Sequence, residues 1–400
     1  MRIVIALVSS SGQISGVERH ALNLAWCLLT RPEIAEVHLV VAPWQQSFVA
    51  DAGLANNPRL RRHAVPISNS ALSRNLWFYA GLPSLAAELG ADLVHLAYPA
   101  PLRRRAFACP VVATLHDLYP YDIPENFGFP KVFFNRAVLR QCLAQADAVA
   151  CVSASTLARL RGLDKRLAQK KARILYNAVQ PQTLPTREVP LPNLDPEHPF
   201  LLCVAQHRRN KNILLVLRAF ERLLQRGHVS RHTKLLIVGI PGPETPAIES
   251  FIAAHSLAQH VILLNGIPET QLQWCYRHCG ALLAPSIIEG FGLPIAEGLI
   301  AGCRIVCSDI PAFRELATDS CHFVTLGSGE EENFAAAICA ALMQPRPDPI
   351  DLPQFAADAI AASCLDLYRS ASPFTSRNDV PLRSPFQPTK ERQSVYDQRT

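Results

Sequence analysis

Charged residues are scarce in this 400-residue sequence, and it contains no long apolar run. Lys, Arg, Asp and Glu make up 18% of the chain and hydrophobic residues 49%, a balance that excludes wholesale disorder and coiled coil. No stretch approaches the roughly 18 apolar residues that a membrane-spanning helix needs. The apolar run that opens MRIVIALVSSSG is shorter than the ~7–15 residues of a signal-peptide core. We therefore expect a cytoplasmic protein with a substantial core.

Metal-binding and redox cysteine motifs are also absent. The twelve cysteines include no C-x-x-C pair, which excludes zinc-finger and dithiol patterns. Most of the cysteines lie inside apolar segments, as buried reduced thiols do. No Asp-x-Asp pair follows a predicted strand, so the sequence requires no metal ion, and we expect no cofactor.

Short strand-like runs alternate with helical patterns from the first residue onwards. Unbroken apolar strands separated by helices are typical of a parallel sheet that is buried on both faces. Residues 1–180 are therefore predicted to form a doubly wound α/β domain. Its predicted strands are residues 2–8, 37–41, 93–96, 111–115, 148–152 and 173–175.

A proline-rich segment, residues 181–199, interrupts this alternation. It holds six prolines and no apolar period, as interdomain linkers do. The alternation then predicts a second doubly wound domain over residues 200–345, a helix over 352–370 and a disordered tail over 371–400. Two such Rossmann-like domains face one cleft with the carboxyl ends of their strands, where ligands of these sheets bind. The second set of predicted strands is 200–205, 234–239, 261–264, 281–285 and 304–308.

The segment PSIIEGFGLPIAEGLIAG, residues 285–302, combines a strand end, a glycine loop and a helix start. The loop consists of Glu289, Gly290, Phe291 and Gly292. Pro294 suits the first helical turn, because its φ is preset and it has no N–H to satisfy. The free backbone N–H groups of Gly292 and Leu293 lie at the positive end of the helix dipole. They suit a phosphate.

Two carboxylates flank this predicted phosphate site. Glu289 lies just before it, and Glu297 lies one turn into the helix. Since carboxylates repel phosphate, we interpret them as hydrogen-bond acceptors for hydroxyls on either side of a diphosphate, as in the two sugars of a sugar nucleotide. The alternative is that Glu297 only favours the helix dipole and Glu289 is an ordinary loop carboxylate.

A basic loop follows the first strand of the second domain, in CVAQHRRNKNILLVLRAF (203–220). Asn212 is predicted to cap the helix that follows. Arg209 and Lys211 then stand at the carboxyl edge of the sheet and face the same cleft as Gly292. Cations there would neutralise charge on a departing diphosphate. The alternative, a solvated surface loop, is less favoured because of this position in the topology.

Six motifs in collinear order resemble those of the retaining glycosyltransferases of family 4 (glycosyl transferases group 1). The resemblance covers about residues 1–370 and implies the two-domain GT-B fold. It also implies transfer of a sugar from a nucleotide-diphosphate sugar to a glycan or lipid-linked acceptor, as in cell-surface polysaccharide or glycolipid synthesis, with the acceptor on the side of the N-terminal domain. The motifs are SGVERHALNLAWCLL, TLHDL, ADAVACVSAST, ILYNAV, the R-x-K-N loop and E-G-F-G-L-P-x-x-E.

The resemblance implies roles for the charged residues. Glu289 corresponds to the glutamate that contacts hydroxyls of the donor sugar, and Glu297 to the one that holds the ribose. Arg209 and Lys211 correspond to the basic pair that grips the diphosphate. His116, in TLHDL, corresponds to a histidine near the reacting carbon of the sugar; its alternative is an ordinary loop histidine.

The glycine motifs match the family with some departures. Gly16 corresponds to a glycine loop beside acceptor and phosphates, but Ser15 precedes it where the family has a second glycine. The backbone around Gly266 corresponds to the loop that reads the nucleotide base. Asn210 stands where Arg is frequent, so Arg208 is an alternative to Arg209 as the phosphate contact.

Two other functions stay open for such a chain. One is a GT-B-shaped nucleotide-sugar epimerase or phosphorylase, which is less favoured because the glutamate pair with the basic loop resembles transferases more closely. The other is a catalytically silent sugar-nucleotide-binding protein, which is less favoured because every expected charged position is filled. No role in nucleic-acid binding is predicted.

The positive charge of the chain is concentrated in residues 1–180, which hold 20 Lys or Arg and 11 Asp or Glu. If the acceptor is lipid-linked, the clusters at 59–62, 103–105 and 165–173 are expected to share one face and to hold the protein at the inner face of an anionic membrane. The alternative is that this charge only steers anionic donors toward the cleft.

Overall fold

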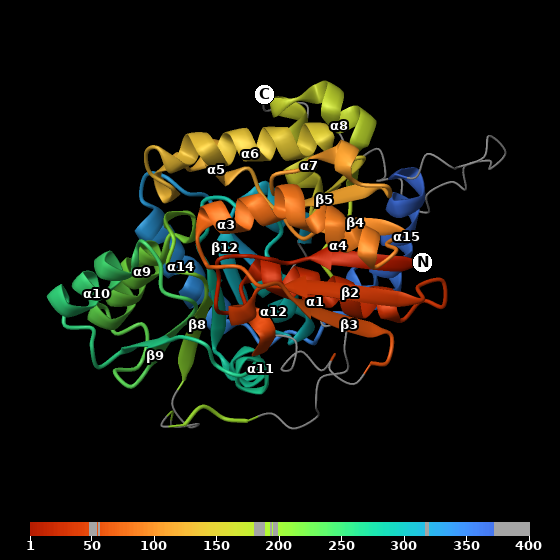
Figure 1. The fold of residues 1–400 in the computed structure, drawn as a ribbon. Coiled ribbons are helices and arrows are strands. Elements are labelled where there is room, and N and C mark those ends of the chain that lie inside the picture. Colours follow the sequence, from red (N-terminus) through yellow and green to blue (C-terminus); the bar gives the residue numbers. More distant parts are fainter. Residues whose placement is uncertain are drawn as a thin grey trace.

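The structure, a computed structural model, describes residues 1–47, 54, 57–179, 189–192, 194, 199–316 and 320–371. Two parallel sheets with helices on both faces form its frame (Figure 1). Each of the eleven segments predicted as strands forms one, within two residues at either end. The predicted fold class, two doubly wound α/β domains, is therefore confirmed.

The first sheet has seven strands in the order β3-β2-β1-β4-β5-β6-β7. Its strands are all parallel, and β1 lies between β2 and β4, with Ile3 beside Val37 and Leu93. Helix α1 covers one face, and α4 and α6 cover the other, because the side chains of the strands point alternately to two core clusters. The strands are β1 (Arg2–Ala6), β2 (Glu36–Val41), β3 (Leu60–Ala64), β4 (Leu93–Leu96), β5 (Val111–Leu115), β6 (Ala148–Cys151) and β7 (Ala172–Ile174). The helices are α1 (Gly16–Leu29), α3 (Ala71–Leu76), η2 (Trp77–Gly81), α4 (Leu82–Glu88), η3 (Arg104–Ala106), α5 (Tyr119–Asp122), η4 (Pro124–Asn126), α6 (Lys131–Gln145), α7 (Ala154–Leu163) and α8 (Lys165–Lys171).

The second sheet has six strands in the order β10-β9-β8-β11-β12-β13, again all parallel. Its strands are β8 (Phe200–Val204), β9 (Lys234–Val238), β10 (Val261–Leu264), β11 (Ala281–Ala284), β12 (Ile305–Ser308) and β13 (Cys321–Val324). Its helices are η5 (Arg209–Lys211), α9 (Ile213–Gln225), α10 (Thr245–Ala254), α11 (Glu269–His278), α12 (Leu293–Ile300), α13 (Pro311–Leu316) and α14 (Glu330–Met343).

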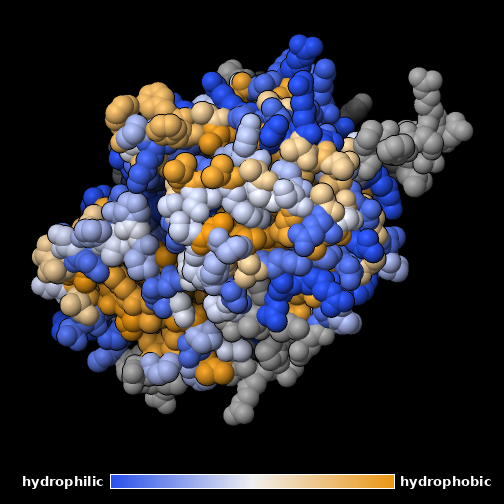
Figure 2. All heavy atoms as spheres, viewed as in Figure 1, coloured by the Kyte–Doolittle hydropathy of each residue, from blue (hydrophilic) through white to orange (hydrophobic). Residues whose placement is uncertain are grey.

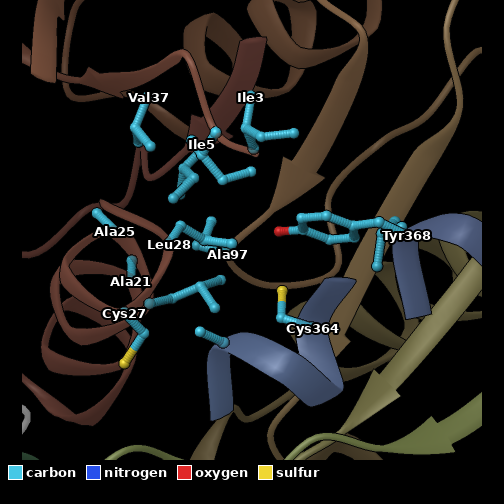
Figure 3. Packing of buried hydrophobic residues seen from close by; sticks show 14 of the residues in the cluster. Ile3, Ile5, Ala21, Ala25, Cys27, Leu28, Val37, Ala97, Cys364 and Tyr368 are labelled. Carbon is cyan, nitrogen blue, oxygen red and sulfur yellow. The ribbon is translucent and has the colours of Figure 1, made fainter. Parts of the chain in front are cut away.

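The last helix, α15 (Ala357–Ala371), returns to the first sheet. In Figure 1 it lies beside the strands near the N-terminus, and Figure 3 shows Cys364 and Tyr368 among the side chains of β1 and α1. The Tyr368 hydroxyl lies 2.7 Å from Nδ1 of His95 on β4. Burying each large apolar side chain of α15 contributes about 1.5–3 kcal/mol. The helix thereby ties the end of the chain to the N-terminal domain.

Within the described residues, the sequence patterns miss two strands and seven α-helices. Strand β3 escapes because Arg61 and Arg62 are exposed at the sheet edge, so it has no apolar run, and β13 is an edge strand that is only half-buried. The missed helices are α3, α4, α5, α7, α8, α13 and α14. Most of the predicted linker 181–199, and 372–400 of the predicted tail, lie outside the described residues. The exact domain boundaries stay a prediction.

The expectation that three basic clusters share one face is wrong. Residues 59–62 belong to β3 and 165–173 to α8 and β7, which lie at opposite edges of a seven-stranded sheet, on the order of 30 Å apart at about 4.8 Å per strand. The guanidinium of Arg59 also donates to the carbonyl oxygens of Arg31 and Ile34. That arginine therefore holds the end of α1 rather than a ligand.

All twelve cysteines are free, and ten of them are buried, as predicted from their positions in apolar segments. Within the described residues, no helix has the length and hydropathy of a membrane span.

Candidate functional site

The predicted phosphate site forms where β11 leads into α12. Gly292 precedes the helix with φ of +104°, and a Cβ there would meet the ring of Phe313 at 2.9 Å, so glycine is required on both counts. In the part of the chain that the structure describes, the N–H groups of Gly292 and Leu293 have no backbone acceptor. The loop thus presents two free donors at a helix N-terminus.

Gly290 lies where the two domains touch. A Cβ at this position would come within 1.9 Å of the backbone oxygen of His116. The carbonyl oxygen of Gly290 accepts hydrogen bonds from the hydroxyls of Ser153 and Thr156, on the N-terminal side of the cleft. The absence of a side chain therefore allows backbone-to-backbone contact between the two domains.

The Phe291 side chain points away from the cleft. It is buried in the core of the C-terminal domain, with its ring centroid 5.2 Å from that of Phe355 and 6.2 Å from that of Tyr176. Only the backbone of this predicted donor-binding residue is available to a ligand.

Glu289 and Lys211 meet at the carboxyl edge of the second sheet, where the topology predicted Lys211 to lie. Their side chains form an ion pair, although 78 residues separate them in the sequence. The carboxylate of Glu289 also accepts hydrogen bonds from Ser286 (2.8 Å) and from the Tyr119 hydroxyl of the N-terminal domain (3.3 Å). Only 9% of the Glu289 side chain is exposed, so the ion pair and these hydrogen bonds oppose the cost of burying its charge.

The basic loop forms a single 3-10 turn, Arg209–Lys211, between β8 and α9. Its middle residue, Asn210, is fully buried and donates from Nδ2 to the Tyr119 hydroxyl (3.1 Å). The Arg208 and Arg209 side chains are exposed, and among the described residues no hydrogen bond or ion pair holds the guanidinium of Arg209. Two arginines thus remain available to an anion, while Asn210 joins the domains.

The expected capping role of Asn212 is wrong. This residue precedes α9, but its backbone is left-handed (φ 50°, ψ 40°) and its side chain makes no capping hydrogen bond. Asn adopts this conformation at lower cost than most residues. Its contribution is therefore the sharp turn that separates Lys211 from the helix.

His116 lies between the cleft and the core of the first domain. Its Nε2 donates to the backbone oxygen of Ala97 (2.8 Å), since a carbonyl can only accept. Burial lowers the pKa of His116 below its usual value, although the bond to Ala97 opposes this. At neutral pH the ring is therefore uncharged, and Nδ1 is left as an acceptor.

Asp117 and Tyr119, which the sequence analysis passed over, complete this side of the site. Tyr119 donates its backbone N–H to Oδ1 of Asp117 (3.0 Å), and its hydroxyl contacts Glu289 and Asn210. Burial raises the pKa of Asp117 to about 6, although that hydrogen bond and the nearby Arg208 oppose the rise. The adjacent H-D pair in TLHDL is the only signal in the sequence that could have indicated Asp117.

Asp117 makes stability depend on pH. Because its folded-state pKa of about 6 exceeds the ordinary value of 3.8, the folded protein binds this proton more tightly, and stability falls as pH rises from about 4 through 6. We expect Asp117→Asn to stabilise the protein at pH 8 by on the order of 1–3 kcal/mol, and to leave it unchanged at pH 3.5. Thermal unfolding at both pH values measures this, with the exposed Asp366→Asn as control. An equal Tm for Asp117→Asn and wild type at pH 8 would contradict the assignment.

Glu297 is buried on α12 and held from both domains. The Tyr276 hydroxyl donates to its Oε2 (2.7 Å), and Arg19 of α1 lies 3.7 Å from its Oε1. Arg19 also pairs with Glu269 of α11 at 2.8 Å. Burial raises the pKa of Glu297, and the charge of Arg19 opposes that rise. Arg19 belongs to the SGVERH motif, but the sequence did not indicate that its side chain contacts the other domain.

Gly16 and Gly266 lie in open space. A Cβ on either glycine would meet nothing within 4 Å. Gly16 begins α1, and Ser15 before it has φ of −107°. This extended conformation does not need glycine, which explains why Ser is tolerated at position 15. Gly266 follows β10 with φ of +69°, so its glycine serves the turn.

Metal ligands do not cluster here. Among the residues that the structure describes, no three His, Cys, Asp or Glu side chains are grouped so that they could hold a metal ion.

Comparison with known proteins defines the family. Residues 14–183 match the family described as "Glycosyltransferase Family 4", and residues 188–352 match "Glycosyl transferases group 1". The chain therefore belongs to glycosyltransferase family 4 and is a glycosyltransferase.

Curated relatives are similar over about half of the chain. O-antigen chain mannosyltransferase RfbU of Salmonella typhimurium is 25% identical over 56% of this chain and 59% of its own length. Serotype-specific mannosyltransferase WbdA of Escherichia coli is 28% identical over 54% of this chain and 27% of its own length. The match thus spans less than two thirds of either relative.

Solved structures share the whole architecture. Sucrose-phosphate synthase from Thermosynechococcus elongatus superposes with a TM-score of 0.67 at 17% identity, covering 92% of this chain and 98% of that one. WaaG, a glycosyltransferase involved in lipopolysaccharide biosynthesis, gives 0.63 at 16% identity, covering 92% and 97%. Anabaena HepE in complex with UDP-glucose gives 0.63 at 16% identity, covering 93% and 96%. The two facing domains thus have the GT-B fold.

Proposed function

We propose that this glycosyltransferase transfers a hexose, with retention of anomeric configuration, from a nucleotide-diphosphate sugar to a glycan or lipid-linked acceptor. The proposal rests on the start of α12 and the loop that precedes it. There the free N–H groups of Gly292 and Leu293 lie between two buried carboxylates, Glu289 and Glu297. Donors for a diphosphate, flanked by acceptors for hydroxyls, match the chemistry of a sugar nucleotide.

The proposed orientation of the donor follows from what surrounds each carboxylate. Glu289 faces Lys211, Tyr119 and the His116 side of the cleft, so the transferred sugar would lie there. Glu297 lies further along α12, beside Tyr276 and Arg19, so the ribose would lie on that side. The base would then approach the open turn at Gly266.

The leaving diphosphate would be stabilised by Lys211, by Arg209 or Arg208, and by the start of α12. In the absence of donor, Lys211 is paired with Glu289. A bound donor would bring hydroxyls to Glu289 and phosphate oxygens to Lys211, so both charges keep partners. Such fixed charges stabilise the transition state because they need no reorganisation as the bond breaks.

The proposed reaction is a front-face substitution through an oxocarbenium-like transition state. Glu289 is occupied by hydroxyls, and no second carboxylate is assigned to attack the anomeric carbon, which disfavours a double displacement. An oxygen of the departing diphosphate would take the proton of the acceptor hydroxyl as the new glycosidic bond forms on the same face. Neutral His116, with Nδ1 as an acceptor, would hold a hydroxyl of the sugar near the reacting carbon.

The test is a donor panel followed by product analysis. The purified protein is titrated with UDP-, GDP- and ADP-sugars that include mannose and N-acetylgalactosamine donors. The donor that binds is then incubated with and without acceptors, and the anomeric configuration of the product is read by NMR. A product with the donor's configuration supports the proposal, and an inverted product contradicts retention.

The same assay separates the other functions. Slow release of free sugar without acceptor is expected of a transferase, whereas an epimerase would yield an isomeric nucleotide sugar and a phosphorylase would need inorganic phosphate. A binding protein would leave every donor intact.

We further propose that the enzyme works at the inner face of a membrane, for a lipid-linked acceptor.

A further inference from the structure

The N-terminal domain exposes an unusual group of large apolar side chains. Phe129 is 85% exposed and Leu72 79%, and the rings of Phe129 and Phe133 stack edge to face at 5.8 Å. Figure 2 shows apolar atoms at the surface over the start of α6 and over α3. The group consists of Leu72, Leu76, Tyr79, Phe129, Phe133 and Phe134.

These side chains belong to one face of the first sheet. Phe78 of η2 and Leu139 of α6 are buried in the same core cluster, so η2 and α6 cover the same face, and α3 runs directly into η2. The loop before η3 joins them, since Leu102 donates its N–H to Gln141 of α6 (3.0 Å) and the Arg103 guanidinium lies 6.0 Å from the Tyr79 ring. We call this face the α3–α6 surface.

The α3–α6 surface is strongly basic. Residues 66–87, 101–110 and 128–146, which form it, contain no Asp or Glu. One of its arginines, Arg104, is neutralised by Asp147 from outside these segments (2.6 Å). Its seven cationic residues are Arg74, Arg103, Arg104, Arg105, Lys131, Arg136 and Arg140.

The surface also borders the cleft. Arg136 of α6 donates from Nε to the backbone oxygen of Pro120 in α5 (2.7 Å). The residue before that proline, Tyr119, contacts Glu289 in the site. A partner bound to the α3–α6 surface would therefore lie beside the acceptor side of the cleft.

We propose that the α3–α6 surface docks on an anionic lipid bilayer, with the phenylalanines in the interface and the cations on the headgroups. Exposed aromatic rings surrounded by Lys and Arg, without acidic residues, suit a bilayer interface, where one apolar and one electrostatic signal together give stable binding. Protein interfaces, in contrast, are depleted of charged residues at their centres, whereas this surface carries seven cations. The inference rests on the proposed function in taking the acceptor to be lipid-linked and the enzyme to work at the inner face of a membrane.

Vesicle flotation tests the proposal without measuring activity. Full-length protein is floated with vesicles of phosphatidylglycerol and phosphatidylethanolamine, or of phosphatidylcholine alone, at 0.1 M and 1 M salt. We expect co-flotation with the anionic vesicles at 0.1 M salt and weaker co-flotation at 1 M, where the Debye length falls from about 10 Å to about 3 Å.

Two sets of variants locate the surface. Replacing Phe129, Phe133 and Phe134 together by Ser should lower partitioning at 0.1 M salt by about a hundredfold or more, since burying one such ring is worth roughly tenfold or more. The matched control is Met343→Ser, which removes an equally exposed apolar side chain (87%) from α14 of the other domain, and it should partition like wild type. Binding unaffected by the triple substitution would overturn the proposal.

A gain-of-signal measurement guards against misfolding of the triple variant. Phe134→Trp should become quenched by vesicles with brominated acyl chains, beyond the quenching of wild type. No flotation of wild type and no added quenching would overturn membrane docking. Self-association of wild type that the triple substitution abolishes, without vesicle binding, would assign the surface to a second copy instead. Transfer to an acceptor in detergent, which does not need docking, decides the proposed function independently.

Discussion

Lys211→Ala and Glu289→Ala are each expected to lose most sugar transfer while the protein stays folded. Lys211 forms an ion pair with Glu289, and this pair lies beside the loop that leads into α12. Removing a preorganised cation from the charge that develops on a departing diphosphate costs on the order of 10²–10³ in kcat. Initial rates with saturating donor and acceptor measure this effect directly.

The control for these variants is an ion pair outside the cleft. Arg222 of α9 pairs with Glu331 of α14 at 2.6 Å in the same domain, so Arg222→Ala removes a comparable contact without touching the site. It should transfer sugar at the wild-type rate. Circular dichroism and Tm confirm that each variant is folded. If a folded Lys211→Ala/Glu289→Ala double variant turned over like wild type, the chemistry would have to lie elsewhere.

The central strands were predictable because they are almost completely buried. Strands such as β1 and β5 are buried on both faces and therefore appear as unbroken apolar runs. Strand β3 has a polar, exposed edge, which removes that signal. Edge strands are therefore the part of a parallel sheet that a sequence pattern is least able to indicate.

The meeting of Lys211 with Glu289 was predictable for a different reason. Both residues follow neighbouring strands of one sheet, β8 and β11, and parallel strands bring such loops to the same edge whatever the loop sequences are. Side-chain positions within the loops do not follow from topology. The left-handed turn at Asn212 and the burial of Phe291 are local outcomes of packing.

The contacts across the cleft could not be predicted at all. Arg19 reaches Glu269 and Glu297, and Tyr119 reaches Glu289, only because the two domains approach each other at one particular angle. No periodicity or motif spacing encodes that angle. Asp117 was missed because its burial, which raises its pKa, is not encoded in any motif spacing.

The two glutamates should separate when nucleotide affinity is compared with donor affinity. Glu297→Gln is expected to weaken binding of free nucleoside diphosphate and of the full donor alike, because its proposed partner is the ribose common to both. Glu289→Gln should weaken the full donor only, because its proposed partner is the sugar. Hydrogen bonds to charged groups are worth about 1.5–3 kcal/mol, so each loss should be roughly ten- to hundredfold in Kd.

Arg19 provides the control that makes this comparison decisive. Glu297→Gln also disturbs the cross-domain pair with Arg19, which could weaken binding without any ribose contact. Glu269→Gln loosens Arg19 from its closer partner, at 2.8 Å, and leaves the carboxylate of Glu297 in place. Calorimetry of all three variants should therefore find near-normal nucleotide affinity only in Glu269→Gln and Glu289→Gln. Equal losses of affinity in Glu269→Gln and Glu297→Gln would mean that Arg19 and domain closure, rather than a ribose contact, account for the role of Glu297. If Glu289→Gln instead weakened free nucleoside diphosphate and Glu297→Gln weakened only the full donor, the proposed partners of the two glutamates would be exchanged.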